Sequence, residues 1–313
     1  MNILLDPSIA STNVGDQIIR QKVDAALAHR LPIAAALPTQ RRLSRAQREV
    51  ARKADLAIVG GTNLLSSNMP FYQQWKLDPG SIRALRGKVV LLGVGWWQYQ
   101  EEPNAYTRWV LGQVLSRDYV HSVRDEYTKT KLENLGFEAL NTACPTMWGL
   151  RNVTAGVTGR PSTVVVTLTD YNKDRVEDPW LIDLLHRYYG RVVVWPQAVR
   201  DAAYASELGV HGDMTVPTLE AFDALLSGPE PVDYIGTRLH GGIRAFDRGA
   251  WGLIVAVDNR ALEIGKDTGL PVHARGDRES IEASVEARLT RRIDLPQTDI
   301  DAWRGQFETV TAG

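Results

Sequence analysis

The sequence predicts an α/β protein made of two doubly wound halves, and three observations carry this prediction. Short, continuously apolar segments alternate with longer segments of helical spacing, which is typical of parallel sheets covered by helices on both faces. The 313 residues are many for one core and fit two domains. A run rich in Gly, Thr and Pro at residues 151–162 interrupts the pattern, so we place the inter-domain connection there.

The first half of the chain alternates strand and helix signals from its first residues onward. It predicts a strand at residues 2–5, a helix at 17–29, a short apolar strand at 32–36, a charged helix at 44–54 and a strand at 56–59. A charged helix is expected before the strand at 88–93, followed by a helix at 106–117, a strand at 120–123 and a helix at 128–135. The helix at 17–29 has its apolar residues on one face, and Gly136 is an apt C-cap for the last helix.

The second half repeats the alternation. Strands are predicted at residues 163–167, 191–195, 232–235 and 253–257, and helices at 180–189, 202–208, 218–226, 241–247, 281–292 and 299–310. Because ligands of open parallel sheets bind outside the carboxyl ends of the strands, the loops that follow these strands are the first place to look for function.

Composition excludes several classes of protein. The net charge of −1 gives no bulk attraction to nucleic acid or to an anionic membrane, so any anion must be recognised locally. The longest apolar run, residues 89–97, is about half the length that spans a bilayer, and the N-terminus lacks the basic start of a signal peptide. We expect a cytoplasmic protein without a transmembrane segment, with contact at the inner membrane surface left open. The single cysteine, Cys144, is expected to be a buried structural thiol.

The most informative stretch follows the strand at 232–235. A Gly-Thr turn leads to Arg238 and His240, and two glycines then open the helix expected at 241–247. Unpaired N–H groups at a helix N-terminus attract anions, an arginine adds a forked cation, and a histidine titrates near neutrality. This combination predicts a pocket for a small anion with an acid/base group at its edge. The alternative is that Arg238 forms a structural salt bridge and His240 caps the helix.

Weaker candidates lie at other strand ends. Asp16, in Asn13-Val14-Gly15-Asp16, is either a first-turn acid or a functional carboxylate. Adjacent tryptophans at 96 and 97 cannot both face one core, so we expect one of them to face a ligand or a domain interface. The spacing favours a local ion pair between Arg124 and Asp125 or Glu126. The corner at residues 195–201 is expected to be structural unless the fold brings it near His240.

Several chemistries find no support. The histidines and the cysteine show no metal-ligand spacing, so no metal is expected. The dinucleotide-binding glycine fingerprint, the P-loop and the nucleophile elbow of α/β-hydrolases are all missing from the sequence.

Four segments in order resemble the polysaccharide pyruvyl transferase family: Asn13-Val14-Gly15-Asp16, Gly60-Gly61-Thr62-Asn63, Ser122-Val123-Arg124-Asp125, and residues 237–245 with their continuation at 251–258. The resemblance implies a GT-B-like fold of two Rossmann-like domains facing across a cleft. Residues 1–155 would form the N-terminal domain on the acceptor side, and residues 156–313 the C-terminal domain on the donor side. The implied activity, in polysaccharide biosynthesis, is transfer of a pyruvyl group from phosphoenolpyruvate onto two hydroxyls of a sugar, which forms a ketal and releases phosphate.

The resemblance also implies roles for individual residues. His240 would be the general acid/base, with Arg238 and Asp16 as the other catalytic residues. Residues expected to bind the donor are Arg124, Thr237, Leu239, Gly241 and Gly242. Residues expected to face the acceptor are Asn13, Gly61, Asn63, Trp96 and Trp97. The acceptor would be a saccharide, free, lipid-linked or nucleotide-linked, and no cofactor is expected beyond the donor phosphoenolpyruvate.

Two other readings stay open on the sequence alone. A GT-B glycosyltransferase that uses a nucleotide sugar would need cations for a diphosphate, and Arg260 and Lys266 are the nearest candidates. At Asn259-Arg260 the chain also departs from the family, which usually carries a lysine after this strand. A non-catalytic saccharide-binding module of the same fold is the third reading, although binding sugar alone needs no acid/base group at an anion pocket.

Overall fold

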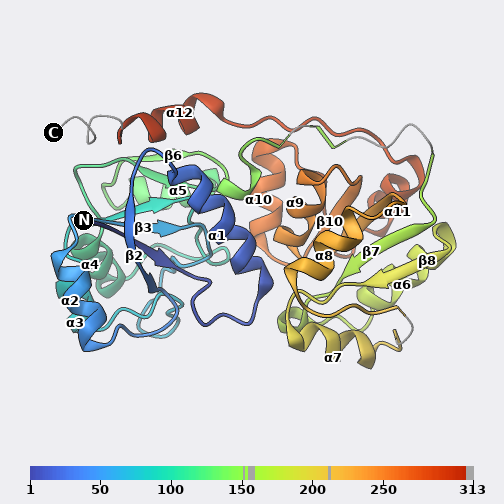
Figure 1. The fold of residues 1–313 in the computed structure, drawn as a ribbon, viewed down its shortest axis with the longest axis horizontal. Helices are drawn as coiled ribbons and strands as arrows, with labels where there is room; N and C mark the ends of the chain where they lie inside the picture. The colour runs from blue at the N-terminus through green and yellow to red at the C-terminus, as the bar shows by residue number, and fades with distance from the viewer. Residues whose placement is uncertain (151, 154–158, 211–212, 308–313) are drawn as a thin grey trace. The chain divides into compact units, whose positions relative to one another are not determined.

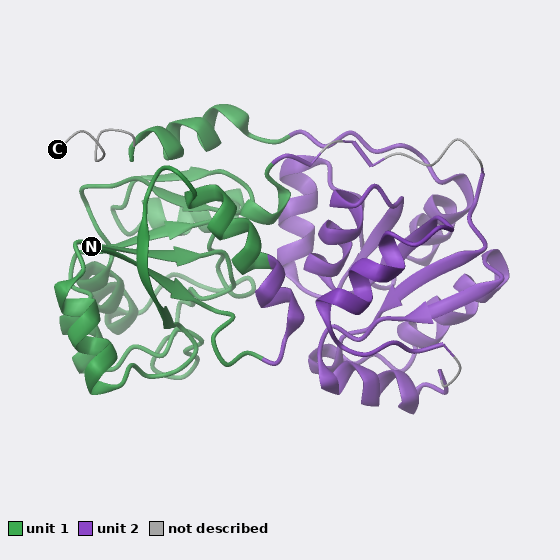
Figure 2. Cartoon of the chain, in the orientation of Figure 1, with its two compact units in different colours: residues 1–11, 19–148, 295–313 green, residues 12–18, 149–294 purple. Residues whose placement is uncertain are grey.

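The computed structural model describes residues 1–150, 152–153, 159–210 and 213–307, and the chain divides into two compact units (Figures 1 and 2). Unit 1 contains residues 1–11, 19–148 and 295–313, and unit 2 contains residues 12–18 and 149–294. Neither unit is therefore one continuous piece of chain. Of the connection expected at 151–162, residues 151 and 154–158 lie outside the described residues.

Unit 1 is built on a parallel sheet in the order β2-β1-β3-β4. Its strands are β1 (Asn2–Asp6), β2 (Ile33–Pro38), β3 (Leu56–Gly60) and β4 (Val89–Leu92). Beyond β4, the short strands β5 (His121–Val123) and β6 (Ala139–Asn141) pair in parallel, and a bridge joins Val94 to Val123. In this order the first strand lies between the second and the third, so the direction of strand succession switches between β1 and β3.

Alternate residues of each strand enter two separate cores, as the period of two in a strand requires. Ile3, Leu5 and Val89 face one cluster, and Leu4 and Val90 face the other. The first cluster is closed by α2 (Arg45–Lys53), α3 (Pro79–Ala84) and α4 (Ala105–Val114). The second is closed by α1 (Val14–Leu27) and α12 (Gln297–Gly305). The continuously apolar strands predicted from the sequence are thus explained by burial on both faces.

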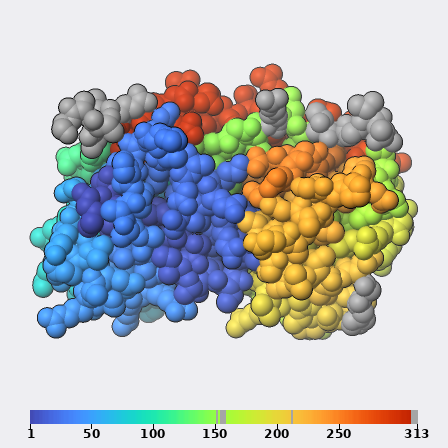
Figure 3. All heavy atoms as spheres, viewed as in Figure 1, coloured from blue at the N-terminus to red at the C-terminus, as the bar shows by residue number. Residues whose placement is uncertain are grey.

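The C-terminal helix belongs to the same unit as the first strand. Trp303 and Phe307 pack in one cluster with Leu4, Ile19 and Val23. Atoms of the red C-terminal segment consequently lie beside blue N-terminal atoms on the surface (Figure 3).

Unit 2 repeats the architecture with a parallel sheet in the order β11-β10-β9-β7-β8. Its strands are β7 (Thr163–Thr167), β8 (Arg191–Val194), β9 (Val232–Gly236), β10 (Gly252–Ala256) and β11 (Val272–Ala274). Its helices are α6 (Glu177–Tyr188), α7 (Val199–Glu207), α8 (Leu219–Leu226), α9 (Leu239–Asp247), α10 (Asn259–Thr268) and α11 (Arg278–Ala287). Here the order switches between β7 and β9, which places the predicted ligand edge at the segments that follow these two strands.

Several helix starts in unit 1 are set by side-chain caps. Ser44 forms a capping box with Gln47, Asp78 and Asn104 cap α3 and α4, and Asp125 accepts a bond from the Thr128 N–H at 2.7 Å at the start of α5 (Glu126–Glu133). Such caps satisfy backbone donors that a helix leaves unpaired.

The predicted α/β class with parallel sheets is confirmed, and the differences are local. Helix α9 begins at Leu239 rather than at 241, and α11 ends at Ala287 rather than at 292 because Arg288 adopts a left-handed conformation with φ 45°. The strands β6 and β11 and the helix α10 were not predicted. The last expected helix begins at Gln297 and ends at Gly305, and residues 308–310 of that prediction lie outside the described residues. Among the described residues, none of the helices combines the length and apolarity needed to cross a membrane.

Candidate functional site

The carboxyl edge of the unit 2 sheet is held rigid by hydroxyl groups between β7 and β9. The Tyr234 hydroxyl lies 2.6 Å from Thr167 Oγ1 and donates to the Arg238 carbonyl at 2.8 Å. The hydroxyl oxygens of Thr169 and Thr237 are hydrogen-bonded, 2.8 Å apart. Glycine is required at 236 because a Cβ there would lie 2.6 Å from the Thr167 backbone nitrogen. The turn that delivers Arg238 and His240 is therefore fixed by its neighbours.

Arg238 follows this turn as a buried, paired guanidinium. Its Nε donates to Asp201 Oδ2 at 2.9 Å and its Nη2 donates to Asp201 Oδ1, so the contact is a fork. Nη2 also lies 3.4 Å from Asp170 Oδ1. The side chain is 6% exposed, and burial raises the pKa of Asp201 against the opposing effect of Arg238. A forked pair of this kind fixes the plane of the guanidinium.

Tyr171 links Arg238 to a second arginine. The Arg238 guanidinium lies 4.9 Å from the Tyr171 ring centroid, and that of Arg260 lies 5.8 Å from it. Arg260 also donates to the Tyr171 hydroxyl and, through Nε, to Asp258 at 2.9 and 3.0 Å. Near the ends of β7, β9 and β10, the guanidinium groups of Arg238 and Arg260 thus face three carboxylates, those of Asp170, Asp201 and Asp258.

Helix α9 starts immediately beside this cluster. Arg238 is its N-cap residue and makes no side-chain cap, and a helix N-terminus is a region that attracts anions. His240 lies in this turn and is 8% exposed. Glycine at 241 and 242 reflects close packing within the helix, because a Cβ on Gly242 would lie 2.7 Å from Ile254 Cδ1. The glycines were expected to open the helix, and this expectation was wrong: they lie inside it, with Leu239 buried before them.

The segment around Asn13 belongs to unit 2 and meets the corner at residues 195–201. The Val14 N–H donates to the Gln197 carbonyl at 2.9 Å, and Gln197 Nε2 donates to Asn13 Oδ1 at 2.8 Å. A side chain at Gly15 would collide with Gln197, and a Cβ at Gly241 would lie 3.3 Å from Gln197 Oε1. Asp16 is 5% exposed in the first turn of α1. Gln197 thereby connects the Asn13 motif to the helix that carries His240.

Unit 1 has its own polar cluster at the carboxyl edge. Arg124 is 2% exposed, donates to Asn63 Oδ1 at 2.8 Å and pairs with Asp125 at 3.1 Å, which confirms the local ion pair indicated by the spacing. Gly95 lies against it, because a Cβ there would fall within 3.0 Å of the Arg124 guanidinium. Gly61, also buried, packs near the Gly93 carbonyl. These residues follow β3, β4 and β5.

The adjacent tryptophans take different environments, as expected. Trp96 is fully buried, and its indole N–H donates to Ser67 Oγ at 3.1 Å. Trp97 is half-buried and stacks on Tyr72 with the ring centroids 3.6 Å apart and the planes 16° apart. Trp97 is therefore the member of the pair that is available near the surface.

The structure gathers the candidate residues into two clusters, one in each unit. Unit 2 holds Asn13, Asp16, Thr237, Arg238, Leu239, His240, Gly241 and Gly242, and unit 1 holds Gly61, Asn63, Trp96, Trp97 and Arg124. Asp170, Tyr171 and Asp201 around Arg238 were given no individual role from the sequence. Asp170 and Tyr171 nevertheless lie in the loop 169–172, at a strand end where ligands are expected, and Asp201 belongs to the corner that was expected to matter only if it approached His240. Within the described residues, no group of three or more His, Cys, Asp or Glu side chains could hold a metal ion.

The chain is similar to a known protein family over most of its length. The family model for polysaccharide pyruvyl transferase matches residues 13–246. The chain belongs to this family. The matched range includes the segments around Asn13, Gly61, Arg124 and His240, whereas β10 and Arg260 lie beyond it. A search of curated proteins returns no match.

Membership in the polysaccharide pyruvyl transferase family gives the broad activity, a transferase acting on polysaccharide. Within the matched range, the buried guanidinium of Arg238 and the side chain of His240 lie at the start of α9.

Proposed function

We propose that the protein transfers a pyruvyl group from phosphoenolpyruvate onto two hydroxyls of a saccharide, forming a cyclic ketal and inorganic phosphate. The observation that carries this proposal is the position of Arg238 and His240, which both lie at the start of α9. This helix begins at the switch point of the unit 2 sheet, in a chain of the polysaccharide pyruvyl transferase family. Phosphoenolpyruvate is a small dense anion, and a helix N-terminus beside a fixed arginine suits such a ligand.

The donor would be bound by groups of different kinds. Arg238 uses Nε and Nη2 for Asp201 and Asp170, so a donor oxygen would receive its hydrogen bond from the remaining edge at Nη1. Thr237 would offer a hydroxyl, and Leu239, Gly241 and Gly242 would offer the backbone and space of the first helical turn. The carboxylates of Asp170, Asp201 and Asp258 offset the charge of the two arginines, so the N-terminus of α9 would add the positive potential that an anionic donor needs.

The reaction balances without an external acid. Protonation of the donor methylene gives a methyl group and an oxocarbenium-like carbon, which the first sugar hydroxyl attacks. Phosphate leaves, and the second hydroxyl closes the ketal on the same carbon. One hydroxyl proton thereby ends on the methyl group and the other on phosphate. We assign the proton transfers to His240, a role that typically contributes about 10²- to 10⁴-fold to rate.

The remaining assignments follow the family resemblance and form part of the same proposal. Asp16 and Asn13 would act on the acceptor from the segment that Gln197 holds near α9, and Gly61, Asn63 and Trp97 would face it from unit 1. Trp96, which was also expected to face the acceptor, is fully buried and is not assigned this role. Assignment of Arg124 to the donor, the GT-B-like arrangement and a cytoplasmic location are proposed on the same ground. No cofactor is required, because the donor already carries the activated group.

Phosphate release from phosphoenolpyruvate in the presence of a saccharide acceptor tests the proposal. We expect His240→Ala to lower turnover by about 10² or more, while calorimetry still detects phosphoenolpyruvate binding. His186→Ala is the matched control, because His186 is exposed on α6, and it should retain wild-type turnover. Wild-type turnover in His240→Ala would overturn the assignment of the acid/base. Consumption of UDP- or GDP-sugars with no consumption of phosphoenolpyruvate would overturn the proposed function.

A further inference from the structure

The charge of the chain is distributed unevenly along its sequence. Residues 41–53, 76–88 and 105–117 contain twelve Lys or Arg and only two acids, Glu49 and Asp78, which gives these segments a net charge of +10. The whole chain has a net charge of −1, so the remaining residues together carry −11. The small net charge of the chain therefore conceals a strongly basic part, and attraction to anions can be local and strong.

The three basic segments meet in one layer of helices in unit 1. They contain α2, α3 and α4, and α3 contacts both of the other helices (Figure 1). Ala51, Ile82 and Val110, one from each helix, are buried in the same core cluster beneath the layer. The outer side of the layer therefore presents the charged residues. We call this outer side the basic face, and its exposed cations are Arg42, Arg45, Arg52, Lys53, Arg83 and Arg86.

Acids of the protein neutralise little of this charge. Among the described residues, Arg52 pairs with Glu49, whereas the other five cations of the basic face have no carboxylate oxygen within 4.0 Å. Arg86 Nε donates instead to the neutral side chain of Gln113 at 3.0 Å. Like charges that are crowded together repel one another and disfavour the compact state. Their retention on one face indicates an anionic partner.

Two exposed aromatic rings border the same cations. Tyr106 and Trp109 lie about one turn apart on α4, are 41% and 50% exposed, and have their ring centroids 6.0 Å apart. Gln113, which accepts the bond from Arg86, lies one turn beyond Trp109 on the same side of this helix. Tryptophan and tyrosine beside Lys and Arg are typical of surfaces that enter the headgroup layer of a membrane. The rings thus favour a lipid surface over a nucleic acid as the anionic partner.

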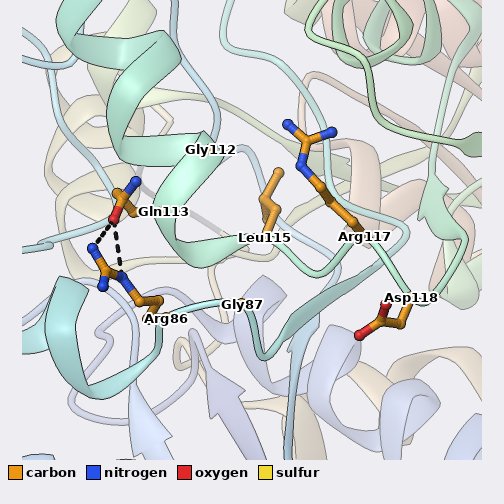
Figure 4. A pocket seen from close by; sticks show the side chains of 7 residues that line it. All are labelled: Arg86, Gly87, Gly112, Gln113, Leu115, Arg117 and Asp118. Carbon is orange, nitrogen blue, oxygen red and sulfur yellow. Dashed lines mark hydrogen bonds between the residues drawn. The ribbon is translucent and has the colours of Figure 1, made fainter.

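A hollow beside α4 adds a recess for an anionic group. It has a volume of about 370 Å³ and is lined by Arg86, Gly87, Gly112, Gln113, Leu115, Arg117 and Asp118 (Figure 4). Arg86 uses Nε and Nη2 for Gln113, and Arg117 uses Nη1 for the Gly136 carbonyl. Each guanidinium therefore keeps further N–H groups for a phosphate, and Asp118 is the acid in the lining.

The hollow lies apart from the candidate site residues of unit 1. Its lining precedes β4 and β5 in the chain, whereas Asn63 and Arg124 follow β3 and β5. It is therefore at the amino side of the sheet, and Asn63 and Arg124 are at the carboxyl side. A partner that covers the hollow and the basic face leaves that carboxyl edge of unit 1 open.

We propose that the basic face docks on the anionic surface of a membrane. Phosphates of the lipid headgroups pair with its arginines, and the rings of Tyr106 and Trp109 enter the headgroup layer. The negative surface potential of such a membrane attracts each cation, over a range of about 10 Å at 0.1 M salt. Docking itself does not depend on the proposed function. Where that function holds, a lipid-linked saccharide is the acceptor that docking would serve.

Sedimentation of the full chain with lipid vesicles, without phosphoenolpyruvate, tests the basic face. Vesicles of phosphatidylcholine alone are compared with vesicles of phosphatidylcholine and phosphatidylglycerol. We expect binding to the anionic vesicles only, and added salt should weaken it. Arg45→Glu should weaken this binding about tenfold or more, because it reverses one charge of the face. The variant should fold, since Arg45 is exposed in the first turn of α2, where an acid is favourable. Trp109→Ala should also bind more weakly.

Each variant has a matched control outside the basic face. Arg292→Glu makes the same charge change at an exposed position of unit 2. Tyr99→Ala removes a ring that is 58% exposed in unit 1 and lies against Tyr127 of α5. Both controls should bind anionic vesicles as the wild type does.

The other outcomes overturn the inference or separate it from the proposed function. Wild-type protein that binds neither kind of vesicle, or binds both equally, overturns it, and so does equal binding by Arg45→Glu and wild type. Binding to a DNA duplex with no binding to vesicles also overturns it and assigns the basic face to nucleic acid. Binding to anionic vesicles by a protein that neither binds nor consumes phosphoenolpyruvate supports the inference, and the proposed function alone then fails.

Discussion

Removing the carboxylate of Asp201 should destabilise unit 2 strongly. Asp201 accepts the fork from Arg238 and also the backbone N–H groups of Asp170 at 3.1 Å and Ala198 at 3.0 Å. Asp201→Ala would leave these donors unpaired and would leave Arg238 charged in a site where its side chain is only 6% exposed.

The expected loss can be worked from these contacts. Breaking a buried ion pair by removing one partner costs about 3–5 kcal/mol, and the two stranded backbone donors place Asp201→Ala at the upper end of that range. Asp201→Asn keeps an acceptor oxygen and should lose less. The double variant Arg238→Met/Asp201→Leu removes both charges, and because burial of Asp201 is itself unfavourable, its loss should fall short of the sum of the two single losses.

Urea unfolding followed by tryptophan fluorescence measures each free energy of unfolding. The pair Arg187–Glu282, 3.1 Å apart with side chains 55% and 36% exposed, is the matched control. Glu282→Ala should change stability by less than about 1 kcal/mol, since exposed pairs contribute little. If Asp201→Ala lost no more than this control, or if the double variant lost the sum of the single losses, Arg238 would not depend on Asp201 as argued.

Three further changes test other parts of the structure. Burial lowers the pKa of His121 to about 4 from its ordinary 6.5, so the folded state holds it neutral; stability should fall by about 3 kcal/mol as the pH drops from about 6.5 to about 4, and urea unfolding of His121→Asn should lack this part of the loss. Gly95→Ala pushes a methyl group into Arg124 and should weaken phosphoenolpyruvate binding about tenfold or more, as measured by calorimetry. Gly236→Ala places a methyl group against the Thr167 backbone and should cost about 3 kcal/mol in urea unfolding.

Each of these changes has a control or a contradicting result. A pH profile of stability identical in His121→Asn and wild type would show that another group titrates in that range. Gly112→Ala, on α4 with no neighbour within 4 Å of the added methyl group, should leave donor binding unchanged, and equal affinity in Gly95→Ala would remove Arg124 from the donor site. Wild-type stability in Gly236→Ala would mean that the strands β7 and β9 can separate at this point.

The sequence was sufficient to predict the fold class because burial on both faces leaves an unmistakable pattern. Strands such as β3 and β7 are buried at every position, so they appear as continuous apolar runs between turn signals. The strands β6 and β11 have three residues each with mixed burial, and they carry no such signal. Helix α10 begins at Asn259 directly after a strand end, and its polar start concealed it.

The candidate site was predicted only as far as local sequence reaches. Arg238 and His240 are neighbours in one motif, and the pair Arg124–Asp125 is adjacent in sequence. Asp201, which follows β8, and Tyr171, which follows β7, approach Arg238 because the strand order places β7 between β8 and β9, a relation that no local pattern contains. Residues 12–18 belong to unit 2 although the residues on both sides of them belong to unit 1, and this brings Asn13 to Gln197. This arrangement is likewise a property of the whole chain.

The return of the chain to unit 1 after residue 294 has a cost during synthesis. The apolar face of unit 1 that includes Leu4 is closed partly by Trp303 and Phe307, which leave the ribosome only after the whole of unit 2. At about 5–20 residues per second, the roughly 155 residues between 148 and 303 take on the order of ten seconds or more to appear. Through that interval the nascent N-terminal half exposes a half-covered sheet face, so chaperone contact in the cell should concentrate there rather than on the later unit.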